Sequence, residues 1–190
     1  PNVVLILADD LGYGDVKCYN AESKVETPHL DQLAREGLRM TDAHSPCTVC
    51  TPTRYSLMTG QFAFRVPRGG TVFTGAGGPS LISPDRLTLP EMLLQRGYTT
   101  ACIGKWHIGM TFFDSEGKAI HQGGPLNHGF ETFFGTACCP TTDWLYAYIE
   151  GDRINHPPTQ ILDRGPLPNH PYANDNRPGM VADDFDLEEV

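Results

Sequence analysis

The feature that most constrains the fold is a short apolar run near the start of the chain that ends abruptly in two acidic residues. Residues 3–8 read VVLILA, and Asp9 and Asp10 follow directly. Six consecutive apolar, mostly branched side chains are typical of a strand buried on both faces, as in parallel sheets covered by helices. The run therefore predicts a buried strand over 3–8. Asp9 and Asp10 would then lie at its carboxyl end, where open α/β sheets bind ligands.

Further helix and strand signals alternate along the chain. Proline-led starts with apolar residues at helical spacing predict helices over 28–37, from Pro52 to a stop at Gly60, and over 90–97. The segment YTTACI predicts a second strand over 98–103. Such alternation favours an α/β fold with a largely parallel central sheet flanked by helices.

Composition excludes two classes of partner. The chain has 190 residues with 39% hydrophobic and 19% charged content, which is ordinary for a globular domain. Its net charge of −9 argues against a nucleic-acid or anionic-membrane surface, because both require clustered basic residues. No apolar run approaches membrane-spanning length. Six cysteines leave the redox compartment undecided, and the adjacent Cys138 and Cys139 are not expected to bridge each other.

Cys50 stands where the N-terminus of a helix can act on it. With Pro52 at the first helical position, Cys50 lies just outside the helix, beside free backbone N–H groups that favour an anion. Arg54, in the first turn, adds a bidentate donor for a tetrahedral oxyanion. The segment CTPTR over 50–54 therefore predicts a reactive side chain next to an anion site.

Two other interpretations of Cys50 stay open. Cys47 and Cys50 form a C-x-x-C pair, a spacing that occurs in redox centres and in halves of zinc sites. The chain has no second C-x-x-C, and this interpretation leaves Pro52 and Arg54 without a role. Alternatively Cys50 is a buried structural thiol, which its polar neighbours argue against.

Lys105 and His107 follow the second predicted strand at its carboxyl end. Alternate residues of a strand point the same way, so these two side chains can converge while Trp106 packs elsewhere. Lys105 offers a point charge and His107 a proton donor or acceptor near neutral pH. Taken alone, a Lys-x-His pattern more often consists of solvated surface residues. An Asp-Asp pair likewise lies more often in a solvated turn.

Three segments together resemble the type I sulfatase family: LADDLGYGD over 7–15, CTPTRYSLMTG over 50–60 and GKWHIG over 104–109. They occur in the family's order and at similar spacing, and the resemblance covers essentially the whole chain. The Cys-x-Pro-x-Arg segment is highly specific, because a maturation enzyme reads it to oxidise the cysteine to formylglycine. By this resemblance Cys50, and not Cys47, occupies the oxidised position.

The resemblance implies an alkaline phosphatase-like fold and an arylsulfatase-like sulfuric ester hydrolase. Asp9, Asp10 and the modified Cys50 would be ligands of one divalent cation, usually Ca²⁺, with Mg²⁺ as the alternative; an all-oxygen ligand set suits such hard ions. Arg54 and Lys105 would bind the sulfate group and neutralise its charge. His107 would hydrogen-bond the formylglycine diol and act as the base that releases sulfate.

The resemblance also implies that this chain holds only part of a site. Family members are typically more than twice this length and contribute a further metal-ligand pair, a histidine acid and a lysine, none of which can be assigned here. Asp183 and Asp184 are not candidates, because residues 182–190 read as the acidic start of a helix. We expect residues 1–190 to be the N-terminal part of the catalytic domain, cut at both ends. The rest of that domain and a C-terminal subdomain would lie in the remainder of the polypeptide.

Substrate, partner and compartment are expectations from the same resemblance. Asp143, Trp144 and His156 could line the mouth of a pocket, with Trp144 stacking on a sugar or aryl ring; ordinary loop packing is the alternative. The expected partners are a sulfated small molecule or glycan and the formylglycine-generating enzyme. The expected location is periplasmic, secreted or lysosomal. Competing functions are a phosphonate monoester or phosphodiester hydrolase and a non-catalytic sulfoglycan-binding relative.

Overall fold

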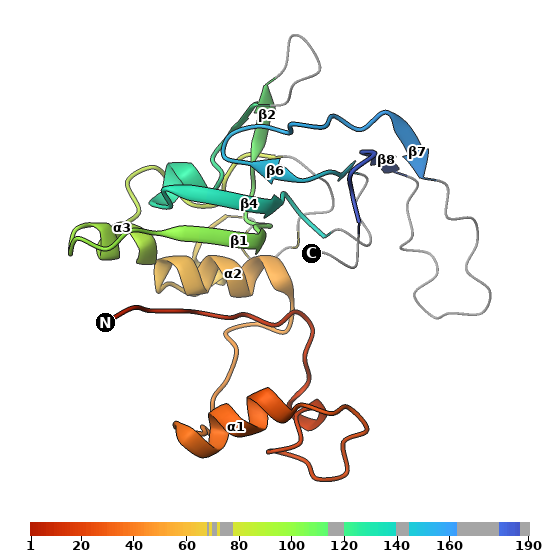
Figure 1. Cartoon of the computed structure of the whole chain (residues 1–190). Helices are drawn as coiled ribbons and strands as arrows, with labels where there is room; N and C mark the ends of the chain where they lie inside the picture. The colour runs from red at the N-terminus through yellow and green to blue at the C-terminus, as the bar shows by residue number, and fades with distance from the viewer. Residues whose placement is uncertain are drawn as a thin grey trace. The chain divides into compact units, whose positions relative to one another are not determined.

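The computed structural model describes residues 1–67, 69, 72, 78–113, 120–139, 145–162 and 179–186. These residues fall into two compact units, Pro1–Ser45 and Pro46–Val190. In chain order the 3₁₀-helices (η), α-helices and strands, labelled in Figure 1 where there is room, are η1 (Tyr13–Asp15), α1 (Pro28–Glu36), α2 (Cys50–Thr59), η2 (Ala63–Arg65), α3 (Leu89–Leu94), β1 (Ala101–Lys105), β2 (Thr111–Phe113), β3 (Ile120–Gln122), η3 (Pro125–His128), β4 (Thr132–Thr136), β5 (Leu145–Tyr146), β6 (Ile149–Glu150), β7 (Gln160–Leu162) and β8 (Gly179–Val181). Within these described ranges, no helix has both the length and the apolar character that crossing a membrane requires.

The first unit is built around α1, which begins at the predicted proline and ends before Gly37. Thr27 does not cap the helix with its own side chain. Its hydroxyl instead accepts a hydrogen bond from the backbone N–H of Lys17 at 2.9 Å, and the Asp31 carboxylate accepts one from the N–H of Cys18 at 2.8 Å. The start of α1 is thereby tied to the loop that precedes it.

The prediction of a strand over residues 3–8 is wrong. These residues carry no strand pairing in the described structure, and Val4 and Ile6 are 81% and 85% exposed. An apolar run favours extended backbone, but a strand also needs a neighbouring segment to pair with its N–H and C=O groups. The described part of this unit offers only helices and loops. Asp9 and Asp10 therefore lie in a bend that leads into η1, not at the end of a sheet strand.

The second unit confirms the α/β class. β1 pairs with β4 in parallel, from Ala101 opposite Thr132 to Lys105 opposite Thr136, and β4 pairs with β6 in antiparallel orientation. Figure 1 shows these three strands side by side. The other described pairings are β2 with β3 (antiparallel), β5 with β8 (parallel) and β7 with β8 (antiparallel). Two of the three sheets of the described residues are thus mixed, with the parallel pair β1–β4 next to the site.

Two of the predicted elements are shifted along the chain. β1 begins at Ala101 and not at Tyr98, because the Thr100 N–H donates to the Glu131 carboxylate at 2.9 Å and not to a neighbouring strand. The Thr100 hydroxyl donates to the Gly129 carbonyl at 2.7 Å, and the Thr100 carbonyl accepts from the backbone N–H of Glu131 at 3.0 Å. α3 ends at Leu94 and turns occupy the residues up to position 97.

The two parallel strands approach each other closely at one pair of glycines. Gly104 of β1 lies opposite Gly135 of β4, and a Cβ built on Gly135 would stand 1.9 Å from the Gly104 carbonyl oxygen. A side chain at position 135 would push the strands apart, whereas a Cβ on Gly104 would meet nothing within 4 Å. Gly135 thus sets how closely the carboxyl ends of β1 and β4 can approach each other.

We therefore expect Gly135→Ala to destabilise the protein by about 2–3 kcal/mol, because the backbone of β1 must shift to admit the methyl group. Gly14→Ala is the matched control, since its Cβ would meet only the Asn20 amide nitrogen, at an ordinary 3.7 Å. Urea unfolding measures both variants. Equal midpoints for Gly135→Ala and the unaltered protein would show that the strand contact tolerates a side chain.

Candidate active site

Cys50 is the first residue of α2. The helix begins two residues earlier than the predicted start at Pro52, with Val49 as the N-cap in extended conformation. Pro52 is the third residue of the helix and fits there because backbone N–H groups of the first turn have no partner within the helix, so none is lost. Cys50 consequently lies in the first turn itself, at the positive end of the helix dipole. Gly60 ends the helix in left-handed conformation, as predicted.

The buried face of α2 fixes where Cys50 points. Thr51, Tyr55 and Met58 lie at helical spacing and are all buried, with Thr51 fully so. Tyr55 and Met58 belong to the main hydrophobic cluster of this unit, which also contains Trp106 and Ile108. The later turns of α2 therefore share one hydrophobic cluster with the segment that follows β1.

The parallel pairing of β1 and β4 continues past the last residues of both strands. The N–H of Trp106 donates to the Thr136 carbonyl and the N–H of His107 donates to the Ala137 carbonyl, each at 2.9 Å. His107 is buried and has a φ of 60°, a left-handed conformation that is uncommon for a residue with a side chain. The extra pairing sets the backbone of 105–107 and of 136–138 at one edge of the sheet.

These elements bring Cys50, His107 and Cys139 together. One ligand atom of each, the two sulfurs and a ring nitrogen, all lie within 4.8 Å of one another. Cys139 Sγ is 3.8 Å from His107 Nδ1. Lys105 also reaches this group, since it hydrogen-bonds Cys139 and its charge acts on Cys50.

The two thiols form a hydrogen-bonded pair with opposite pKa shifts. The pKa of Cys50 is raised, chiefly by its hydrogen bond with Cys139 and then by burial, against the opposing charge of Lys105. The pKa of Cys139 is lowered, first by that same hydrogen bond and then by those with His107 and Lys105, although burial opposes them. The shared hydrogen bond thus favours the thiol form of Cys50 and the thiolate form of Cys139.

Arg54 ties α2 to the end of β1. Its guanidinium donates a hydrogen bond to the backbone carbonyl of Lys105. Its charge also acts on Cys102, where it partly offsets the burial that raises the pKa of that thiol to about 11. The charge of Lys105 thus acts on Cys50, and Arg54 is held at the backbone of Lys105, so two cationic side chains meet at the end of β1.

Trp106 packs away from this group and anchors it. Its indole N–H donates to the Gly109 carbonyl at 3.0 Å, and its ring stacks on His128 with 6.1 Å between the ring centroids. Burial lowers the pKa of His128, so this ring stays neutral near pH 7. The neutral ring is held by the Ser80 hydroxyl, 3.0 Å from its Nε2.

The remaining predicted residues are placed as follows. Asp9 and Asp10 belong to the first unit, and their meeting with Cys50 stays a prediction. Asp143 and Trp144 lie outside the described residues. His156 is exposed, with its Nε2 3.9 Å from the Asp184 carboxylate, and Asp183 and Asp184 occupy a turn.

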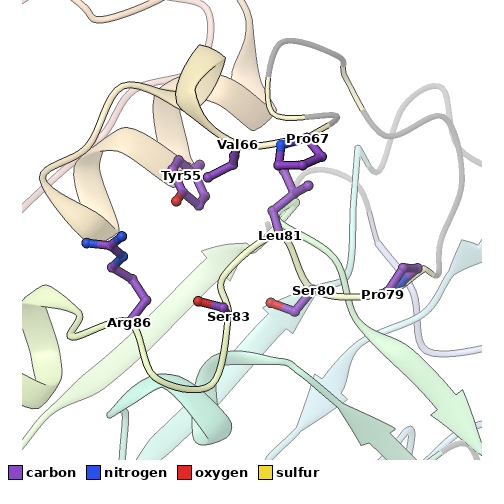
Figure 2. Close-up of a pocket in the computed structure, with 8 residues that line it drawn as sticks. All are labelled: Tyr55, Val66, Pro67, Pro79, Ser80, Leu81, Ser83 and Arg86. Atoms are coloured by element: carbon purple, nitrogen blue, oxygen red, sulfur yellow. The ribbon is translucent and has the colours of Figure 1, made fainter.

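A hollow of about 360 Å³ lies elsewhere in this unit. Figure 2 shows its lining, which comes from Tyr55 of α2 and from the stretches 66–67, 79–81, 83 and 86. The lining does not include Cys50, Arg54, Lys105 or His107. The hollow is therefore separate from the chemistry described above.

Comparison with solved structures defines the class of protein. A structure from work on the metabolism of multiple glycosaminoglycans by Bacteroides thetaiotaomicron matches with a TM-score of 0.72 and 29% identity, covering 88% of this chain and 35% of that one. The PsFucS1 sulfatase from Pseudoalteromonas sp. matches with a TM-score of 0.53 and 35% identity, covering 70% of this chain and 25% of that one. The fold is thus the alkaline phosphatase-like α/β fold of these neighbours.

Sequence comparison gives the family. The profile of the Sulfatase family matches residues 1–164. Mouse steryl-sulfatase is 37% identical over 174 residues, which make up 88% of this chain and 26% of that protein. Human arylsulfatase A is 44% identical over 137 residues, 71% of this chain and 25% of that protein. The chain belongs to the sulfatase family, and it spans about a quarter of the length of these two relatives.

Proposed function

We propose that this chain is the N-terminal part of a sulfatase catalytic domain, residues 1–190, and that it carries the nucleophile of a sulfate monoester hydrolase. The observation that carries the proposal is the position of Cys50, in the first turn of α2 and in contact with the groups that follow β1 and β4. Family membership and the Cys-x-Pro-x-Arg segment support it. The rest of the site would come from the remainder of the same polypeptide.

The proposed nucleophile is formylglycine made from Cys50 by a maturation enzyme. Hydration of its aldehyde gives a side chain with two hydroxyls on one carbon. One hydroxyl attacks the sulfur of the ester as the alcohol or phenol leaves. His107 then takes the proton of the second hydroxyl, which expels sulfate and restores the aldehyde. Arg54 and Lys105 neutralise the charge on the sulfuryl oxygens during both steps.

A divalent cation fits the proposed site only in the modified state. Asp9 and Asp10 offer carboxylate oxygens, which suit Ca²⁺ or Mg²⁺, whereas the thiol of an unmodified Cys50 does not. Conversion of Cys50 would give an all-oxygen set in which Asp9, Asp10 and residue 50 hold the ion. When bound, the ion would make the attacking hydroxyl more acidic.

The proposed substrate is a sulfate monoester of an aryl compound or a carbohydrate. One structural neighbour, Ps i-CgsB, with a TM-score of 0.57 and 32% identity over 71% of this chain, was solved in complex with k-i-k-neocarrahexaose, which supports a carbohydrate. The steryl-sulfatase relative supports a smaller sulfate ester equally. We further propose a periplasmic, secreted or lysosomal location.

Parallel assays test the ester class. The protein with its remaining polypeptide should hydrolyse an aryl sulfate faster than the matching phosphate diester and phosphonate monoester. A sulfate monoester offers Arg54 and Lys105 three non-bridging oxygens that share its negative charge, whereas each of the phosphorus esters offers two. Preference for the phosphorus esters would assign it to the phosphonate monoester or phosphodiester hydrolases. Binding of sulfated glycans without turnover of either ester would indicate a non-catalytic relative.

A further inference from the structure

Cys139 adds a second sulfur to the site, and the proposed sulfatase reaction does not use it. It lies just beyond β4, while His107 lies just beyond the parallel neighbour β1 and Cys50 opens α2. Three separate elements therefore present two thiols and one imidazole to one another. Such a set is chemically unlike the oxygen ligands proposed for the hard cation.

The spacing of these ligand atoms suits a tetrahedral zinc ion. Zn–S bonds of about 2.3 Å and Zn–N bonds of about 2.0–2.1 Å place ligand atoms roughly 3.5–3.8 Å apart around a tetrahedron. The His107 Nδ1 to Cys139 Sγ distance is 3.8 Å, and all three ligand atoms lie within 4.8 Å of one another. Shifts of a few tenths of an ångström to about 1 Å complete the geometry, with the fourth position left to water.

The position of His107 is fixed by the backbone. The residue is 1% exposed, its left-handed conformation is held by the N–H bond to the Ala137 carbonyl at 2.9 Å, and the preceding Trp106 is locked in the core. The hydrogen bond from the Thr136 hydroxyl to the Cys138 carbonyl, at 3.0 Å, restrains the loop that carries Cys139. Two of the three ligands are thus positioned before any ion arrives, which limits the entropy lost on binding.

We propose that the unmodified chain binds one borderline-soft divalent cation of the zinc class through Cys50, His107 and Cys139. Binding displaces the proton that the two sulfurs share, and the two thiolates then balance the charge of the ion. This balance lets the ion sit beside the Lys105 ammonium without net repulsion. The site exists only while residue 50 is a cysteine, because formylglycine removes one of its two sulfurs.

The binding itself does not depend on the proposed function, but its consequence does. If Cys50 is the residue that a maturation enzyme oxidises, a zinc ion on its sulfur withholds the substrate of that enzyme. Cys139 would then control maturation from outside the Cys-x-Pro-x-Arg segment. Zinc-loaded chain should be converted more slowly than metal-free chain, with the difference lost in Cys139→Ser.

Cobalt binding tests the proposal on the full chain made without the maturation enzyme. Co²⁺ added to metal-free protein should give thiolate charge-transfer and tetrahedral d–d absorption bands, and Zn²⁺ should displace them at one equivalent. Cys139→Ser should weaken Zn²⁺ binding by at least about 100-fold. Cys102→Ser and Cys47→Ser are matched controls that should bind as the unaltered chain does. Absence of the bands, equal affinity in Cys139→Ser, or a loss confined to Cys47→Ser would overturn the site.

A second measurement needs no variant. Zn²⁺ should protect Cys50 and Cys139 from alkylation in the unaltered chain, while Cys18 and Cys47 react at the same rate with and without the ion. Peptide mass spectrometry reads each position. Equal labelling of Cys50 and Cys139 in both conditions would contradict the proposal, whether or not the mature protein is a sulfatase.

Discussion

Replacing Cys50 with serine should abolish multiple turnover of a sulfate ester, by at least about 1,000-fold in kcat. Serine keeps a single hydroxyl that can attack sulfur, but it lacks the second hydroxyl whose deprotonation expels sulfate. The variant should therefore stop at a covalent sulfate ester on residue 50. Steady-state assays of the protein with its remaining polypeptide measure the loss, and intact-mass analysis after incubation with substrate detects the added sulfuryl group.

The matched control is Cys102→Ser, which removes a partly buried thiol of β1 outside the cluster of Cys50, His107 and Cys139. It should retain the activity of the unaltered protein once its lower stability is allowed for. Full multiple turnover by Cys50→Ser would contradict the assignment of residue 50 as the nucleophile. Urea unfolding of both variants accompanies the assays. If both variants lose activity and lose folded protein to the same extent, the lost activity results from unfolding and not from the missing nucleophile.

Replacing Arg54 with lysine should lower kcat by about 100- to 1,000-fold, the usual cost of removing one aimed donor from an oxyanion site. Lysine keeps the charge but lacks the planar fork whose separate nitrogens would let Arg54 donate to the Lys105 carbonyl and to a sulfuryl oxygen. The Lys105 backbone would also lose a restraint. We expect the fall in kcat to exceed any rise in KM, because the charge to be stabilised grows in the transition state.

Arg96→Lys is the control for this change, since Arg96 lies in an exposed turn after α3. Its kinetic constants should not move. An Arg54→Lys variant with unchanged kcat and a raised KM would mean that Arg54 binds substrate and transition state equally. Unchanged values of both constants would remove Arg54 from the site.

Local signals predicted the helices better than the strands. Proline and glycine placed α1 and α2 within two residues, because both act through the backbone of the residue itself. The segment 3–8 has a strand-like composition but no partner in the described structure, since pairing depends on a second segment that composition does not reveal. Likewise β1 starts at Ala101 because the N–H of Thr100 donates to the Glu131 side chain and not to a neighbouring strand.

The grouping of the candidate side chains was predicted in part. Cys50, Lys105 and His107 were found from their residue types beside helix and strand ends, and the structure places them together. Cys139 was missed because only the parallel register of β1 and β4 puts it next to His107. A usable signal was present: Cys138 and Cys139 follow a Phe-Phe-Gly-Thr-Ala segment over 133–137, at the same edge that Lys105 and His107 were assigned to.

The most direct test of the central claim is mass spectrometry of the peptide that contains Cys50. The protein is produced in a host whose maturation enzyme demonstrably converts a second Cys-x-Pro-x-Arg protein made in the same cells. We predict that residue 50 carries an aldehyde, which reacts with a hydrazide probe, while Cys47 in the same peptide remains a thiol. A plain thiol at Cys50 under these conditions would contradict the account.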